Sequence, residues 1–295
     1  MYLPYHPNPI GFILARFNLR VAFLSISIMN RFATVALTWL ALAGTLAVNA
    51  LANILPINGL NTGQVSGFYP NLFVPDGFTF SIWSVIYLGL LAFAGYTTRV
   101  VGWLPAEAVA RQRVVAILPL FWLSCGFNAG WIVVWHYLQV GLSLVVMLAL
   151  LATLLVIFLR LQQHRPGRFT ASNLLADTPF VMYLAWICVA TIANTTALLV
   201  HLGWQGGVIA PAGWSIGLQV VAFGLATAIT LWYGRPAFSL VVAWALWGIY
   251  RAQSGPVAFV AASGAAVLLM MALAALARKT AHTAAESMVK QCARQ

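Results

Sequence analysis

The sequence predicts an all-α integral membrane protein, and three observations lead to this fold class. Apolar residues make up 62% of the 295 residues, whereas charged residues make up only 6%. Apolar runs of about 20 residues, the length that crosses a bilayer as a helix, recur along the chain. Basic residues gather in alternate connections between those runs. A typical soluble domain carries about 25% charged residues, so this composition excludes a soluble globular protein.

About eight runs are long and apolar enough to be predicted as transmembrane helices. In chain order they are 33–55, 77–98, 114–136, 138–159, 176–201, 214–233, 236–250 and 256–277. The seventh run is the shortest, and the alternative for it is a tilted or partly re-entrant segment.

The distribution of positive charge predicts how these helices are oriented. With the N-terminus in the cytoplasm, Arg251 alone among the 15 lysine and arginine residues falls on the outer side. The positive-inside rule therefore predicts cytoplasmic N- and C-termini, and helical spans favour the bacterial inner membrane. If 236–250 does not cross, the C-terminus moves outside. Topology thus accounts for the net charge of +11, and no nucleic-acid partner is expected.

The two chain ends are predicted to lie outside the bilayer. Residues 1–32 form an N-terminal cytoplasmic segment, and residues 280–295 form a polar C-terminal tail. Met29 stands directly before the first apolar run, so one interpretation is that Met29 is the true start. The other interpretation is a short amphipathic segment on the inner membrane surface.

The connection 56–76 is the longest polar stretch between predicted helices. It is rich in Gly, Asn and Pro and contains no basic residue. Loops of this length in a compact protein are often functional lids, and a plain connector is the alternative.

No set of residues in the sequence predicts an enzyme. Asp76 and Asp177 each stand at a predicted helix start, which is typical of N-caps. Glu107 lies four residues before Arg111, which is typical of a pair on a helix surface. The three cysteines lack metal-ligand spacing. We therefore expect no catalysis, no metal site and no resident cofactor.

Aromatic residues within the apolar runs are the most informative feature. The chain has 12 Trp, and several of them lie inside predicted spans, where the indole N–H needs a partner. Helical spacing places Trp83 with Tyr87 on one face, and Asn128 with Trp131 on another. Trp83 and Asn194 fall roughly 10 Å, and Asn128 about 12 Å, below the outer ends of their helices. The pattern predicts either an aromatic pocket under residues 56–76 or polar and aromatic packing between helices.

Three motifs then resemble those of a known family. Tyr183-Leu-Ala-Trp186 followed by Ala190-Thr191 and Asn194 is similar to the PYLAWxxxATxxN motif of the TspO/MBR family, the tryptophan-rich sensory proteins related to the translocator protein. Asn128-Ala-Gly-Trp131 resembles the LNxxW motif. The stretch from Pro75 through Trp83 to Tyr87 resembles the PPxWxxxxxWxxxY motif. The motifs occur in the family's order and cover about 33–204, whereas the three predicted helices within 205–279 lie outside them.

The resemblance implies a five-helix bundle, commonly a homodimer, that binds porphyrins and other apolar ligands beneath the loop between the first two helices. Carried over by motif, the implied ligand-binding residues are Pro75, Phe78, Trp83, Tyr87, Asn128, Trp131, Tyr183, Trp186, Ala190 and Asn194. The sequence departs from the motifs at Gly77, Val74, Met182 and Leu198. Because the family holds its ligands with aromatic pocket walls, these departures bear on which ligand is bound.

The function we expect is a TspO-like receptor, sensor or carrier in the lipid bilayer that binds a tetrapyrrole or a sterol-like ligand. A transporter of small metabolites that uses all eight helices is the alternative. A membrane enzyme acting on a lipid or tetrapyrrole is a third hypothesis, and the missing acid–base set argues against it.

Overall fold

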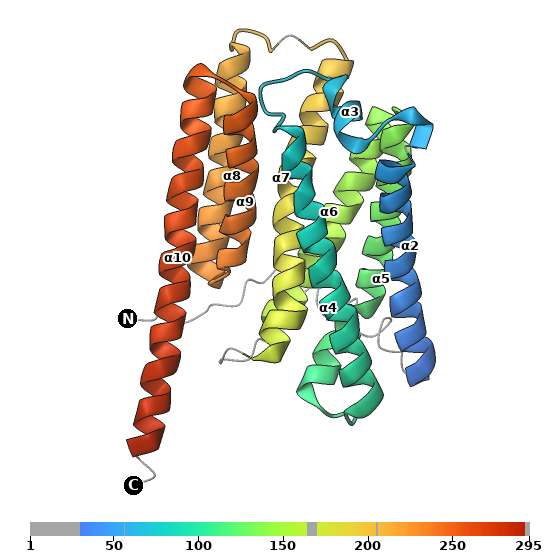
Figure 1. Ribbon diagram of the computed structural model, residues 1–295, viewed down its shortest axis with the longest axis vertical. Helices are drawn as coiled ribbons and strands as arrows, with labels where there is room; N and C mark the ends of the chain where they lie inside the picture. Colours follow the sequence, from blue (N-terminus) through green and yellow to red (C-terminus); the bar gives the residue numbers. More distant parts are fainter. Residues whose placement is uncertain (1–29, 56, 164–169, 205, 293–295) are drawn as a thin grey trace.

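The computed structural model describes residues 30–55, 57–163, 170–204 and 206–292, and over these ranges it contains helices and no strand (Figure 1). The long helices are α2 (Arg31–Ile54), α4 (Ile82–Trp103), α5 (Val109–His136), α6 (Val140–Gln163), α7 (Thr178–His201), α8 (Pro211–Tyr233), α9 (Pro236–Ala252) and α10 (Gly255–Cys292). The short elements are η1 (Ile57–Gly59), α3 (Thr62–Gly67), η2 (Gly77–Ser81) and η3 (Asn173–Asp177). The all-α prediction is confirmed. Residues 1–29, with the alternative start at Met29, lie outside the described residues.

Within the described ranges, 7 helices are long and apolar enough to cross a membrane. The exception among the long helices is α9, the seventh predicted span, which has 17 residues and is about 25 Å long. It is continuous and runs antiparallel to α8 and α10 (Figure 1). Arg235 before its start pairs with Asp177 at the start of α7, and Arg251 near its end pairs with Asp76 before α4. Short as it is, α9 therefore runs from one end of the bundle to the other.

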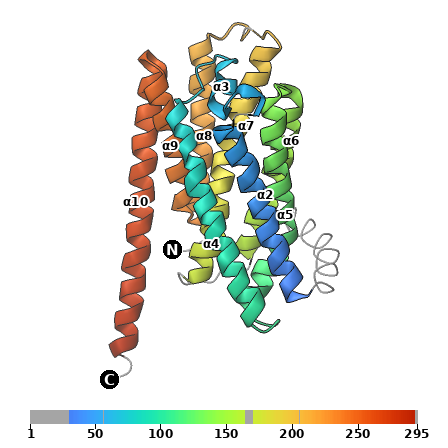
Figure 2. The ribbon, with the colours of Figure 1, turned by 45° about the vertical axis from the view of Figure 1, so that its right-hand side comes forward.

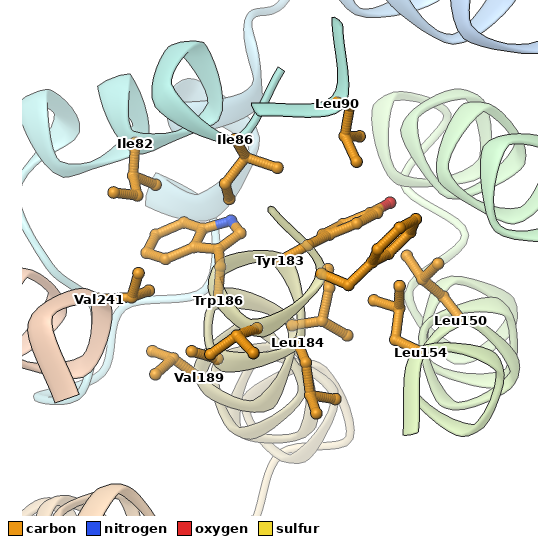
Figure 3. Packing of buried hydrophobic residues seen from close by; sticks show 14 of the residues in the cluster. Ile82, Ile86, Leu90, Leu150, Leu154, Tyr183, Leu184, Trp186, Val189 and Val241 are labelled. Atoms are coloured by element: carbon orange, nitrogen blue, oxygen red, sulfur yellow. The ribbon is translucent and has the colours of Figure 1, made fainter. Parts of the chain in front are cut away.

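The helices form two groups that meet along α7. The five-helix unit consists of α2, α4, α5, α6 and α7, and the extension consists of α8, α9 and α10 (Figures 1 and 2). The main contact between the groups is α9 on α7. In Figure 3, Trp186 of α7 lies between Ile86 of α4 and Val241 of α9, and all three are buried. The extension therefore shares the hydrophobic core of the five-helix unit.

The two ends of the bundle differ in composition. The loop end is where α2 ends and α4 begins, and residues 57–76 lie there. The basic end is where α5 begins and α6 ends, and it carries Arg113 and Arg160. At the basic end, Gly234 adopts a left-handed conformation (φ 62°) that ends α8 and lets the chain turn into α9.

The predicted roles of the acidic residues hold only in part. The Asp76 carboxylate caps η2 by accepting from the Thr79 backbone N–H at 3.2 Å. Asp177 is not a cap, and that prediction is wrong. The helical chain runs through η3 into α7 without a break, so the N–H groups beyond Asp177 are not free, and its carboxylate is fully buried in ion pairs.

The prediction that Glu107 and Arg111 pair on a helix surface is also wrong. α5 begins only at Val109, so Glu107 precedes the helix and the four-residue helical spacing does not apply. The Arg111 guanidinium donates instead to the carbonyl oxygen of Leu104 at 3.3 Å.

Candidate ligand-binding site

A cavity of about 540 Å³ opens at the loop end between α2 and the start of α4. Its volume lies within the range of about 300–1,000 Å³ that is usual for small-molecule sites. The wall residues come from α2, α3, η2 and α4, and they are Leu46, Asn49, Ala50, Ile54, Thr62, Phe80, Ser81, Trp83, Ser84 and Tyr87. The predicted loop contributes Thr62, so it borders the cavity.

Aromatic rings of α4 and α7 build one side of this cavity. Trp83 stacks on Tyr87 with ring centroids 5.4 Å apart and planes 19° apart. Behind them, Tyr183 and Trp186 meet the Trp83 ring edge-on at 5.9 and 6.2 Å. Edge-on and stacked arrangements at these distances are favourable, so the wall is held in place without a ligand.

A network of buried polar groups ties this wall to the core. Asn128 of α5 is fully buried, and its amide donates to the Tyr183 hydroxyl at 2.8 Å. Its carbonyl oxygen accepts from the Asn49 amide at 2.8 Å and from the Tyr87 hydroxyl at 3.4 Å. Because Asn49 and Tyr87 line the cavity, the network reaches from the cavity wall to α7.

Asn49 is a wall residue that the sequence analysis missed. The signal that points to it is its polar amide inside the apolar run 33–55, since such residues bond across helices or face a cavity. It belongs to α2, which carries none of the three motifs.

Trp131 and Asn194 form a second cluster, which packs helices together. The Trp131 indole donates to the Asn194 side-chain oxygen at 3.2 Å, and the Asn194 amide donates to Ser143 of α6 at 2.9 Å. Trp131 also stacks on Trp135, with centroids 5.8 Å apart. Because these groups are buried and bonded to one another, their geometry supports packing between α5, α6 and α7.

The remaining predicted residues do not share one position. Phe78 is 58% exposed and lies against Trp244 of α9, with centroids 5.6 Å apart. Pro75 is buried and lines a different cavity. Ala190 is partly buried against the core. The Trp186 indole N–H is buried, and it has no acceptor among the described residues.

The loop at this end is folded and packed. Tyr69 is buried, with its ring centroid 6.0 Å from Trp135 and 5.9 Å from His201. Burial raises the pKa of the Tyr69 phenol above its ordinary value. Val65 and Phe73 are buried as well. The loop therefore covers the end of the five-helix unit as a structured element.

The extension holds the second half of this loop, and η2 directly after it, through hydrogen bonds to their backbone. Ser215 of α8 donates to the Leu72 carbonyl oxygen at 2.7 Å. The Trp244 indole of α9 donates to the Thr79 carbonyl oxygen at 2.9 Å. The Asp76 N–H donates to the carbonyl oxygen of Gly248 at 3.1 Å.

Glycine at position 248 is required for α9 to lie this close to η2. A Cβ atom at that position would lie 1.9 Å from the Thr79 hydroxyl oxygen. The glycine therefore allows α9 to pass directly against η2. No motif in the sequence indicated the contact, because its partners are far apart along the chain.

The described walls of the cavity can bind a small molecule, because they combine aromatic and aliphatic side chains with amide and hydroxyl groups. Over the residues that the structure describes, no group of three His, Cys, Asp or Glu side chains is placed to hold a metal ion.

Comparison with known proteins gives one match. A family model described as TSPO-like protein matches residues 35–274. The match runs from α2 into α10, so it includes α8 and α9 and extends past the range 33–204 that the motifs cover. No curated protein and no solved structure matches the chain.

Proposed function

Since the chain belongs to the TSPO-like protein family, we propose that this multi-pass membrane protein binds a bulky apolar ligand of the tetrapyrrole or sterol class in the cavity between α2 and α4. It acts as a receptor, sensor or carrier, and it does not change the ligand covalently. The observation that carries the proposal is the cavity itself, because Trp83 and Tyr87 of the motif on α4 line it.

The wall supports this ligand class in three ways. The Trp83 and Tyr87 rings provide aromatic area for an apolar body. Asn49 keeps one edge of the wall polar, and its amide nitrogen donates to the Thr45 carbonyl oxygen and to the Asn128 side-chain oxygen. The loop residue Thr62 borders the cavity, so a bound molecule contacts the loop.

Titration of the purified protein with protoporphyrin IX, followed by the absorbance of the porphyrin, tests the proposal. We expect saturable binding that weakens about tenfold or more in Trp83→Ala and in Tyr87→Ala, because each removes a ring from the wall. Trp232→Ala is the matched control, since Trp232 is 81% exposed on α8, away from the cavity. A linear response, or equal affinity in all the variants, would overturn the proposal.

Transport and sensing make different demands on the same site. A carrier moves the porphyrin across the bilayer of a sealed liposome, whereas a receptor only binds it. Porphyrin uptake into liposomes containing the wild type or Trp83→Ala separates these roles. Uptake that requires Trp83 supports a carrier, and binding without uptake supports a receptor or sensor. Recovery of the ligand with a changed mass would instead support an enzyme.

We propose further that the basic end faces the cytoplasm of a bacterial inner membrane. Arg31, Arg99, Arg160 and Arg278 lie at or near this end, and Arg251 lies at the other. Labelling of single cysteines in intact cells tests the orientation. A cysteine at exposed Val208, in the connection before α8, should react with a membrane-impermeant maleimide, and one at exposed Glu107 should not.

A further inference from the structure

We propose that the protein has a second binding site, at the loop end between the five-helix unit and the extension, that takes an uncharged single-chain amphiphile such as a monoacylglycerol. A cavity of about 680 Å³ lies there. Its walls come from the loop, the end of α7, the start of α8 and the end of α9, and they include Leu72, Phe73, Leu199, Trp204, Trp214 and Leu218.

The absence of charge in these walls determines the class of ligand. The described residues that line the cavity include no Asp, Glu, Lys, Arg or His, although the chain as a whole has a net charge of +11. An ionised group buried against these walls would find no counter-charge among the described lining residues, which is costly. A carboxylate, a phosphate or a porphyrin with its propionates is therefore disfavoured. The side-chain oxygens of Asn71 and Gln253 and the Ser66 hydroxyl can accept from a hydroxylated head, while the two amide nitrogens donate to the Tyr69 and Val74 carbonyl oxygens.

The positions of the wall residues along the helices favour an elongated molecule. Pro211 begins α8, and Leu218 lies about 10 Å further along the same helix. Leu199 and Thr196 line the cavity from the last turns of α7. The neutral polar residues Asn71 and Gln253 come from the loop and from the end of α9, nearer the end of the bundle. The cavity therefore offers hydrogen bonds near the end of the bundle and an apolar wall deeper in.

The rim of this cavity is fixed by interactions of its own. Trp204 and Trp214 pack edge-on with centroids 5.0 Å apart. The Trp214 indole donates to the Gly206 carbonyl oxygen at 2.8 Å. Both rings are partly exposed, as is typical of aromatic residues at a membrane–water boundary. A rim that is ordered in this way and lies at the membrane–water boundary suits a lipid with a small head group and one acyl chain.

The second site is distinct from the cavity between α2 and α4. The two cavities share no lining residue in the described chain, since Thr62 borders the first and residues 66–75 border the second. Protoporphyrin IX, the probe of the first cavity, carries ionised propionates, whereas a monoacylglycerol is uncharged. A variant that loses binding at one cavity can therefore still be tested for binding at the other.

Binding of radiolabelled 1-oleoylglycerol to the full-length purified protein in nanodiscs tests the inference. We expect saturable binding to the wild type and an affinity lowered about tenfold or more in Leu218→Trp, which fills the cavity from α8. Val221→Trp is the matched control, because Val221 is on the same helix and 59% exposed. It should bind like the wild type.

Thr196→Phe fills the same cavity from α7 and keeps the test decisive if Leu218→Trp fails to fold. Excess protoporphyrin IX should not displace the label, and ionised oleate should compete much less well than unlabelled 1-oleoylglycerol. Wild-type affinity in either folded filling variant overturns the inference. An equal loss in Val221→Trp, or full displacement by the porphyrin, does so as well.

Discussion

The extension is joined to the five-helix unit at both ends of the bundle, but the two junctions use different chemistry. At the basic end, the Asp177 carboxylate pairs with Arg113 of α5 at 2.9 Å and with Arg235 at 2.8 Å, and all three side chains are buried. At the loop end, Ser215 and Trp244 donate to backbone carbonyl groups of the loop and of η2, and the one ion pair described there, between Arg251 and Asp76, is partly exposed.

This difference indicates that the basic end is held more rigidly than the loop end. Buried charges that pair only with one another tolerate little movement, because any separation leaves a charge without compensation. Neutral hydrogen bonds to a loop can be exchanged for water or ligand groups at small cost. Both described cavities lie at the loop end.

The largest effect is expected from Asp177→Ala at the basic end. The substitution leaves the Arg113 and Arg235 charges buried without their carboxylate, which costs about 3–5 kcal/mol. Thermal unfolding of the purified protein in detergent measures the loss. Glu107→Ala removes the same charge from an exposed position near the same end, and its unfolding temperature should match the wild type. Equal stability of the two variants would show that the buried pairs do not hold the basic end together.

An intermediate effect is expected from Gly248→Ala at the loop end. The added methyl collides with Thr79, so α9 and η2 must separate, at a cost of about 1–3 kcal/mol. Gly224→Ala on α8 is the matched control, since no atom lies within 4 Å of its added Cβ. The unfolding temperature of the control should be unchanged or slightly raised, because alanine favours helix more than glycine does. If the Gly248→Ala protein is as stable as the control, the close contact between α9 and η2 does not contribute to stability.

The smallest effect is expected from Arg251→Ala. Its pair with Asp76 at 2.7 Å is as short as the buried pairs, but the Arg251 side chain is 49% exposed. Exposed pairs contribute about 0–1 kcal/mol, so the unfolding temperature should barely change, and raising the salt concentration should reduce the difference further. A loss as large as that of Asp177→Ala would remove the distinction between the two ends.

The helices could be predicted from the sequence because length and hydropathy determine a membrane span locally. Each long helix begins and ends within a few residues of its apolar run, except that α10 continues to Cys292. The grouping of Trp83 with Tyr87 followed from spacing on one helix, and the structure has them stacked.

What could not be predicted depends on contacts between distant segments. The burial of Asp177 in an ion pair depends on Arg235, 58 residues further on, and no local sequence pattern indicates that partner. The position of Phe78 is set by Trp244 and Trp247 of the extension. The hydrogen bonds from α8 and α9 to the loop and η2 are accepted by backbone carbonyl groups, and the pattern of side chains in the sequence does not indicate such acceptors.

The carboxylate of Asp177 also bears on the order in which the protein is assembled. One oxygen pairs with Arg113, which precedes it in the chain, and the other pairs with Arg235, which follows it. During synthesis from the N-terminus, Arg113 and Asp177 are both made before Arg235 emerges. The five-helix unit can thus insert with its acidic side chain already neutralised. The second oxygen then accepts from Arg235, the residue directly before α9, so the helices made later dock onto a carboxylate that is already in place.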